Sequence, residues 1–421
     1  MNYPVASRDE RPRALTSARN PDRPTPKRTK SPHAVGSSSV LEVALDAITC
    51  NAQELRRAVG PNRRIFAALK ANAYGYGLQE VAKAVVAGGA DSISLANVSD
   101  AVALRRAGME CPILLYPSVP LTEDLGRLIE HERLVPTILD PASARRLARV
   151  VAGEQTVFLK VDVGLERLGV SESELVQLAT QVSSLPNLRL GGLYTHMHVP
   201  LTGNDVMPYL QWQFARFQSA VRALQSISVN VPLSMVVSTA VLQLTNSMTL
   251  NALDPGRIFY GMDEGGPGLS GLTLRPALVA LRTRLVQVKV ISRDEYRELA
   301  PFPIRDSMRI GVVPLGSFHG FESFSCGEVL VRGTRARVAG SPSIEHARID
   351  LTDIPAAVAG DEVVIIGTQG SQTISPGEVA RQLGLPSAGY LALGIRESVS
   401  RAYVTGLADT QSARPSGQPR G

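Results

Sequence analysis

The feature that most constrains the fold is an alternation of short apolar runs with amphipathic segments between residues 65 and 237. The strand-like runs are Ile65–Leu69, Ser92–Leu95, Pro112–Tyr116, Leu134–Leu139, Thr156–Val161, Leu188–Leu193 and Leu233–Val237. The helix-like segments are Leu78–Ala87, Ser99–Ala107, Glu123–Glu132, Ala142–Val151, Ser171–Val182 and Tyr209–Gln225. Strands that alternate with helices of about ten residues form βαβ units and a parallel sheet. Six or more such units predict an α/β fold, a closed (β/α)₈ TIM-like barrel of about 250 residues.

A second pattern begins at about Pro267. Runs rich in Val and Ile, separated by turn residues, lie at Leu281–Ile291, Val329–Val331, Arg335–Val338, Ala347–Leu351 and Glu362–Ile366. Helical signals are scarce until Pro376–Leu383, where Ser375 would be the N-cap. This pattern predicts a mostly antiparallel β domain after the barrel.

The two ends of the chain differ from both patterns. Residues 1–38 are rich in Arg, Pro and Ser and poor in large apolar residues. Such a segment cannot bury enough apolar surface to fold alone. It also lacks the apolar h-region of a secretory signal peptide, so a signal peptide is not expected. We therefore expect a disordered basic extension over 1–38, a barrel over 39–266, a β domain over 267–407 and a disordered tail over 408–421.

Charge and cysteine usage narrow the class of partners. The net charge is +6, and the first 40 residues, with eight Lys or Arg against three Asp or Glu, account for five of these charges. A nucleic-acid-binding fold is expected to carry its basic patch on the folded body, so no nucleic-acid partner is expected. The sequence contains no run of about 18 apolar residues, so no membrane span is predicted. Cys50, Cys111 and Cys326 lie far apart and form no CxxC, which favours a reducing, cytoplasmic setting.

Polar residues gather where the predicted barrel strands end, which is where such barrels place their active sites. Lys70 directly follows an apolar strand. A lysine in this position is either a Schiff-base nucleophile of lowered pKa or an ordinary solvated lysine at a strand end. Arg167, in the segment from Leu159 to Gly169, could orient a cofactor hydroxyl or a substrate carboxylate, or belong to an ion-paired surface turn. His196 and His198 could be half of a metal site, but no acidic or cysteine ligand lies nearby in sequence, so no metal is expected.

A fourth segment, Asp254-Pro255-Gly256-Arg257, contains a turn with free backbone N–H groups. Such groups can cradle a phosphate, and the hydroxyls of Ser238 and Thr239 could assist. Each of these four segments alone is weak evidence for a site.

Together, the four segments resemble the alanine racemases, pyridoxal 5′-phosphate enzymes of fold type III. The matching stretches are Leu69-Lys70-Ala71-Asn72-Ala73-Tyr74-Gly75, Lys160 to Gly169, Leu193 to His196 and Pro255 to Gly261. The resemblance runs from about Val40 to Tyr403. It implies a barrel followed by a β domain, a small amino-acid substrate, and a homodimer in which the partner's β domain completes each site.

The resemblance also implies roles for single residues. Lys70 would carry the cofactor as an internal aldimine and act as one catalytic base. His196 would stack on the cofactor ring and Arg167 would contact its hydroxyl. Lys160 matches a lysine that is carbamylated in some members. The residues implied around the phosphate are Tyr74, Ser238, Thr239, Gly256, Arg257 and Tyr390.

One departure from the family concerns the second catalytic base. Ser317 falls where the family has a tyrosine, and a serine hydroxyl is shorter and far less acidic than a phenol. His319 lies two residues on and could serve as the base, because residues two apart share a face if the segment is extended. The alternative is that His319 caps a turn.

Other departures lie near the ring nitrogen and the substrate. Asp254 stands where the racemases have an arginine against the pyridine nitrogen. A carboxylate there would keep that nitrogen protonated, unless the loop shifts and Asp254 never meets the ring. Ile344 and Glu345 replace a Met-Asp pair that helps to contact the substrate carboxylate.

Three hypotheses follow from these matches and departures. The first is a pyridoxal-phosphate-dependent amino-acid racemase with a replacement second base. The second is a one-base enzyme of the same fold, a decarboxylase, a β-eliminating lyase or an aldolase, and it rests on Ser317 and Asp254. The third is a pyridoxal-phosphate-binding protein without catalysis.

Overall fold

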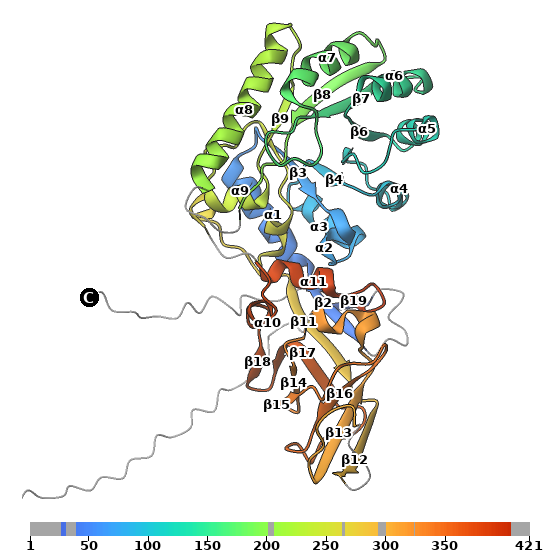
Figure 1. Ribbon diagram of the computed structural model, residues 1–421, viewed down its shortest axis with the longest axis vertical. Coiled ribbons are helices and arrows are strands. Elements are labelled where there is room, and N and C mark those ends of the chain that lie inside the picture. The colour runs from blue at the N-terminus through green and yellow to red at the C-terminus, as the bar shows by residue number, and fades with distance from the viewer. Residues whose placement is uncertain are drawn as a thin grey trace, which may run out of the picture.

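The computed structural model describes residues 27–30, 39–200, 206–262, 266–293, 300–323 and 325–405. It contains a closed barrel of eight parallel strands and a domain of mostly antiparallel sheets (Figure 1). The predicted fold class is therefore confirmed. The expected disordered tail 408–421, and the expected extension apart from residues 27–30, lie outside the described residues.

The barrel closes in the order β10-β3-β4-β5-β6-β7-β8-β9. Its strands are β3 Arg64–Ala68, β4 Ser92–Leu95, β5 Ile113–Leu115, β6 Leu134–Ile138, β7 Gln155–Lys160, β8 Leu188–Tyr194, β9 Leu233–Met235 and β10 Ala252–Leu253. Sequence reasoning missed β10, whose two residues are too short to show a pattern. The strand closes the barrel because Ala252 pairs with both Arg64 and Met235.

Helices surround the barrel on its outside, as Figure 1 shows for α4 to α8. They are α1 Leu45–Val59, α2 Lys70–Tyr74, α3 Leu78–Ala87, α4 Val98–Arg106, α5 Glu123–His131, α6 Pro141–Val150, α7 Glu172–Ser183, α8 Val206–Ser226 and α9 Thr239–Leu244. The inside of the barrel is filled by a buried cluster of Phe66, Leu114, Phe158, Tyr194, Met235 and Ala252. The barrel is thus a packed core, and chemistry is left to its rim.

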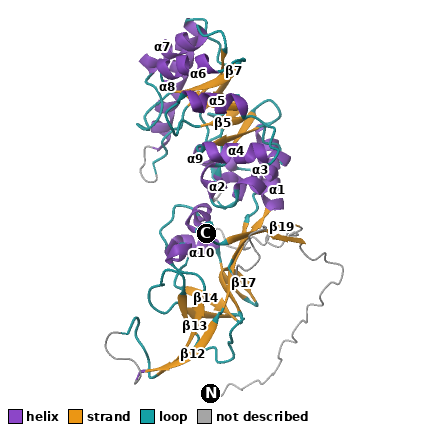
Figure 2. Cartoon of the chain, turned by 90° about the vertical axis from the view of Figure 1, so that its right-hand side faces the viewer, coloured by secondary structure: helices purple, strands orange, loops and turns teal. Residues whose placement is uncertain are grey.

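The β domain lies beyond one end of the barrel (Figure 2). Its larger sheet has the order β1-β19-β2-β11-β17-β14-β15, with β18 paired to β17. Its strands are β1 Lys27–Lys30, β2 Val40–Ala44, β11 Leu278–Arg284, β14 Glu328–Val331, β15 Thr334–Arg337, β17 Glu362–Gln369, β18 Gln372–Ile374 and β19 Ser400–Thr405. A smaller sheet joins β12 Gln287–Ser292, β13 Ser307–Val313 and β16 Ala347–Asp350.

Two sequence expectations need correction in this domain. The single strand expected over Leu281–Ile291 is two strands in different sheets, β11 and β12. They separate at Leu285, which is buried and donates its N–H to Asp361 O at 2.9 Å. Within the extension expected to be disordered, residues 27–30 instead form β1, because their backbone pairs antiparallel with β19.

Two short helices lie on the side of the β domain that faces the barrel. They are α10 Pro376–Gln382 and α11 Leu391–Gly394, and α11 lies beneath α2 in Figure 1. The expected N-cap of α10 is confirmed, because the Ser375 side chain accepts the Glu378 N–H at 3.1 Å. No helix in the described ranges is long and apolar enough to cross a membrane.

Candidate active site

Lys70 lies where β3 ends, and the chain after it turns in the left-handed conformation. Ala71, Asn72 and Ala73 have φ of 53° to 55°, Tyr74 has φ of 55°, and Gly75 has φ of 85°. Each non-glycine residue in this region costs roughly 1 kcal/mol. Four such residues in a row persist only when their surroundings hold them in place.

The β domain of the same chain supplies that support. Asn72 Nδ2 donates to Glu397 Oε1 at 2.9 Å, and Arg401 Nε donates to Gly75 O at 3.0 Å. A side chain on Gly75 would place its Cβ 2.1 Å from Ala392 O in α11. The turn that carries Lys70 is therefore clamped between the barrel and the segment from α11 to β19.

The amine of Lys70 lies mostly out of solvent and among charges of both signs. Burial lowers the pKa of this amine, and the Asp254 carboxylate opposes the shift. The guanidinium groups of Arg167 and Arg257 lower the pKa further. A lowered pKa makes the neutral amine more available as a nucleophile or base.

Asp254 follows β10, next to β3, and its side chain is buried. The Tyr116 hydroxyl donates to Asp254 Oδ2 at 3.0 Å, whereas Oδ1 is buried without a hydrogen-bond partner among the described residues. Burial raises the pKa of this carboxyl to about 7. The Tyr116 hydrogen bond and the amines of Lys70 and Lys160 oppose that rise.

Lys160 and His196 follow on neighbouring strands. Lys160 ends β7, with its amine 5.4 Å from the ring centroid of Tyr194, and burial lowers its pKa to about 8. His196 comes two residues after the end of β8. Burial, together with the cations Lys70 and Arg167, lowers its pKa to about 3. The imidazole is therefore neutral at physiological pH. A neutral ring can stack on another ring, because stacking needs no charge.

Arg167 is carried by a loop that one carboxylate organises. Asp162 Oδ1 accepts the N–H groups of Gly164 and Leu165, both at 2.9 Å, and Oδ2 accepts the Arg167 N–H at 2.8 Å. The Arg167 side chain is exposed, yet its charge acts on Lys70 and on the other basic residues of the rim. The loop thus presents a cation at the mouth of the barrel.

The turn at Gly256 lies beside these residues. Two of the backbone N–H groups that were expected to be free are not, because Thr239 Oγ1 accepts those of Gly256 and Ile258, at 3.1 and 3.3 Å. A side chain on Gly256 would place its Cβ 2.6 Å from the Tyr74 hydroxyl oxygen, so it would displace the Tyr74 ring. Ser238 is the N-cap of α9, and its side chain makes no capping hydrogen bond.

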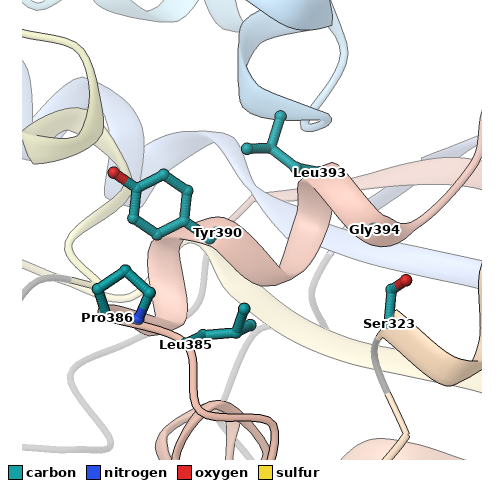
Figure 3. Close-up of a pocket in the computed structure, with 6 residues that line it drawn as sticks. All are labelled: Ser323, Leu385, Pro386, Tyr390, Leu393 and Gly394. Carbon is teal, nitrogen blue, oxygen red and sulfur yellow. The ribbon is translucent and has the colours of Figure 1, made fainter.

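The β domain adds one aromatic ring to this side of the site. The Arg257 guanidinium carbon lies 4.9 Å from the ring centroid of Tyr390, which ends a short turn at Ala388–Tyr390. Figure 3 shows Tyr390 at the edge of an apolar hollow of about 330 Å³. The hollow is lined by Ser323, Leu385, Pro386, Tyr390, Leu393 and Gly394.

Four predicted residues stand apart from this cluster. Ser317, Ile344 and Glu345 are exposed on the β domain, and Glu345 acts electrostatically on His319. No hydrogen bond or ion pair of the described residues joins any of the four to Lys70. The structure therefore brings together the barrel residues and Tyr390, but not the substrate-side residues of the β domain.

The segment around His319 is not extended, so the geometric premise for a base two residues after Ser317 was wrong. Ser317–His319 form a 3₁₀ turn, and His319 Nδ1 accepts the Gly316 N–H at 3.1 Å. The structure thus shows the turn-capping alternative for His319. Because Nδ1 is the acceptor, the neutral ring carries its hydrogen on Nε2 and presents a donor.

Sequence reasoning missed Tyr116 and Arg401. Tyr116 is the last residue of a predicted barrel strand, so the rule that strand ends carry the site could have found it. Arg401 is buried in β19 and donates to the carbonyls of Gly75, Ile395, Arg396 and Val399. Nothing in its local sequence shows that role.

The residues of the rim fit the pyridoxal phosphate that the resemblance implies. They offer an amine of lowered pKa, a neutral imidazole, a cation on a loop, and a glycine turn beside the Ser238 side chain, which makes no capping hydrogen bond. The buried, unpartnered Oδ1 of Asp254 offers one more contact to a bound group.

Comparison with known proteins agrees with this geometry. The family described as alanine racemase, N-terminal domain, matches residues 43–264, and the alanine racemase C-terminal domain matches residues 278–403.

Whole proteins and a solved structure match as well. The alanine racemase of Desulforamulus reducens is 33% identical over 335 residues, which cover 77% of this chain and 89% of the relative. That of Halothermothrix orenii is 29% identical over 369 residues, covering 86% and 96%. The crystal structure of alanine racemase from E. faecalis superposes with a TM-score of 0.77 at 26% identity, covering 88% of this chain and 99% of that one.

Proposed function

The chain belongs to the alanine racemase family, and from that premise we propose that it interconverts the enantiomers of alanine, or of a broader set of small amino acids, with pyridoxal phosphate bound at Lys70. The observation that carries the proposal is the position of Lys70. Its amine has a lowered pKa and lies at the rim of a closed barrel beside Lys160, His196 and Asp254.

The residues that would hold the cofactor divide by chemistry. Lys70 would bind it covalently, His196 would stack on its ring and Arg167 would contact the ring hydroxyl. The phosphate would be held by Tyr74, Ser238, Thr239, Gly256, Arg257 and Tyr390. When bound, pyridoxal phosphate delocalises the negative charge that develops at the α-carbon of an amino acid.

The chain's own groups would then move protons. The Lys70 amine can accept or return a proton on one face of the α-carbon, because its lowered pKa makes its neutral form accessible. The buried rim would exclude water and strengthen the charge interactions there. Arg167 would supply the cation for the substrate carboxylate. Ile344 and Glu345 lie apart from Lys70 in one chain, so they would approach that side of the substrate only from a second copy.

Racemisation needs a second proton carrier on the opposite face. Ser317 and His319 are the candidates, and this chain does not bring them to its own Lys70. Phe318 and Ile344 are exposed apolar residues of the same face, with exposed fractions of 57% and 70%. We place this face against the barrel of a second copy, so that the homodimer would complete each site.

A one-base reaction is the second candidate function. It is favoured by the state of His319, whose Nδ1 accepts the Gly316 N–H and whose Nε2 therefore carries a hydrogen. In that state Nδ1 is already occupied as an acceptor and Nε2 carries a hydrogen, so the ring has no free lone pair with which to abstract the α-proton. A chain without a base on the second face would exchange the α-proton with retention, or release a carbon or a leaving group.

The test is a proton NMR assay in D₂O. Purified full-length protein with pyridoxal phosphate would be given L-alanine, L-serine and other amino acids. Loss of the α-proton signal with formation of the D-enantiomer is expected. Lys70→Ala should abolish both, and Lys83→Ala, a change at an exposed lysine that pairs with Glu80, should leave both unchanged.

Other results of this assay would contradict the proposal in different ways. Exchange with retained configuration, or a new product, would support the one-base reaction. Absence of exchange from a protein that binds the cofactor at Lys70 would support a binding role without catalysis. A cytoplasmic setting stays a prediction, supported by three free cysteines.

A further inference from the structure

The barrel rim holds a buried acid that the proton transfers proposed above do not use. Asp254 is 6% exposed, Tyr116 donates to its Oδ2, and its Oδ1 has no hydrogen-bond partner in the described part of the chain. A buried, unpartnered carboxylate oxygen is costly and calls for an explanation, and a bound group that donates to it is one. The Oδ1 atom is therefore the acceptor that a bound group should fill.

The arrangement around this oxygen limits which part of a cofactor can fill it. Burial, and next the charge of Asp254, raise the pKa of the Tyr116 phenol well above its ordinary value, so the phenol stays a donor and occupies Oδ2. Lys70 and Lys160 act on Asp254 through their charges. The proposed function commits the Lys70 nitrogen to a covalent bond with the cofactor, so it is no longer a free amine that could donate to Oδ1.

The chemistry of pyridoxal phosphate leaves one donor for an ionised carboxylate. Its phosphate is an anion and would be repelled, and its ring oxygen accepts hydrogen bonds when ionised. Only the ring nitrogen, when protonated, donates a hydrogen bond from the ring. An ionised carboxylate beside that nitrogen favours the protonated form.

Resting on the proposed function, we infer that Asp254 binds the ring nitrogen of the cofactor and keeps it protonated, with Tyr116 as the positioning residue that turns Oδ1 toward the ring. One proton moves, from water to the ring nitrogen, as the site fills. Its positive charge is balanced by the Asp254 carboxylate, so the buried pair is neutral overall.

This pair sets how strongly the cofactor withdraws electrons. A protonated ring nitrogen stabilises negative charge at the α-carbon more than a neutral nitrogen does. The chain would therefore accept amino acids whose α-protons are less acidic. Removing the charge with Asp254→Asn should slow α-proton exchange by about 100-fold, the size of effect seen when one preorganised electrostatic contact is lost.

The test reads the nitrogen directly. Full-length protein is loaded with pyridoxal phosphate carrying ¹⁵N in the ring, and the ¹⁵N chemical shift is followed from pH 6 to 9. The wild type should keep the shift of a protonated ring. Asp254→Asn should show the unprotonated shift at pH 7, and Tyr116→Phe should lose the proton at lower pH than the wild type and bind the cofactor about tenfold more weakly.

The matched control is Tyr194→Phe. Tyr194 is also a buried tyrosine of the barrel, but its hydroxyl donates to Thr137 Oγ1 at 2.9 Å rather than to Asp254. This variant should titrate like the wild type, which separates the role of Tyr116 from general damage to the barrel.

The outcomes also separate this inference from the proposed function. An unprotonated ring nitrogen in wild-type protein that holds the cofactor at Lys70 overturns the inference alone. An identical ¹⁵N profile for wild type and Asp254→Asn overturns it as well. Absence of any covalent link at Lys70, read by mass spectrometry after borohydride reduction, overturns the proposed function and this inference with it.

Discussion

Asp254 makes the stability of the cofactor-free protein depend on pH. Burial raises the pKa of its carboxyl from 3.8 in the unfolded chain to about 7 in the fold. The folded state therefore holds this proton more tightly than the unfolded state does. The stabilisation that results is fully present below pH 3.8 and is lost as the pH rises through 7.

Asp254→Asn should remove this pH dependence. One pKa unit corresponds to about 1.4 kcal/mol. We therefore expect the free energy of unfolding of the wild type to fall by about 3 kcal/mol relative to that of the variant between pH 5 and pH 8. Urea unfolding of both cofactor-free proteins at the two pH values measures this difference. A wild type whose free energy of unfolding rises relative to that of the variant between pH 5 and pH 8 would contradict the sign of the argument.

At the scale of elements, the turn α2 has to be held in shape because five successive residues are left-handed. Gly75→Ala tests this dependence. The new Cβ would lie 2.1 Å from the backbone oxygen of Ala392, and φ is 85°. The backbone of Ala392 cannot move aside as a flexible side chain can. We therefore expect the free energy of unfolding to fall by about 3 kcal/mol or more, and cofactor binding to weaken.

Gly108→Ala is the control for that change. Gly108 has a similar φ of 84°, but a Cβ there meets nothing within 4 Å. The free energy of unfolding of Gly108→Ala should fall by only about 1 kcal/mol, because backbone strain is the only cost. Thermal unfolding and cofactor titration compare the two variants, and equal losses would show that α11 does not restrain the turn.

At the scale of the whole molecule, Arg401 joins the two domains. It donates hydrogen bonds to Gly75 in the barrel and to three carbonyls that precede β19. Arg401→Met keeps the bulk of the side chain and removes every donor. We expect a lower melting temperature and faster amide exchange over residues 70–78, since a buried charge-assisted network is lost.

Two further variants sharpen this prediction. Arg401→Lys should restore stability only in part, because a lysine cannot present several donors in one plane. Arg309→Met removes an arginine that donates to Ala357 O inside the β domain. If Arg309→Met changes exchange over residues 70–78 as much as Arg401→Met does, the domain link is not specific to Arg401.

A shared active site predicts complementation between inactive variants. Lys70→Ala and Ser317/His319→Ala proteins would each be inactive alone. In an equal mixture, half of the dimers are mixed and each mixed dimer has one intact site, so roughly a quarter of the wild-type activity should return. An activity assay before and after subunit exchange measures it, and no recovery would contradict a site shared between subunits.

The sequence by itself predicted seven of the eight barrel strands and placed Lys70 at the end of one of them. Period-two apolar runs and amphipathic helices are local patterns, so they can be seen without knowing what packs against them. Lys70 could be placed at a strand end for the same reason, and Gly256 in a tight turn. The closed barrel and the β domain were confirmed.

Contacts between distant residues were decided only by the tertiary structure. Tyr116 meets Asp254 across 138 residues, and Arg401 meets Gly75 across 326, so no local pattern encodes either pair. The left-handed turn after Lys70 is likewise invisible in Ala71, Asn72 and Ala73, because residues of the β domain hold it. His319 became a turn cap because Gly316 offered it an N–H, which only the folded loop could show.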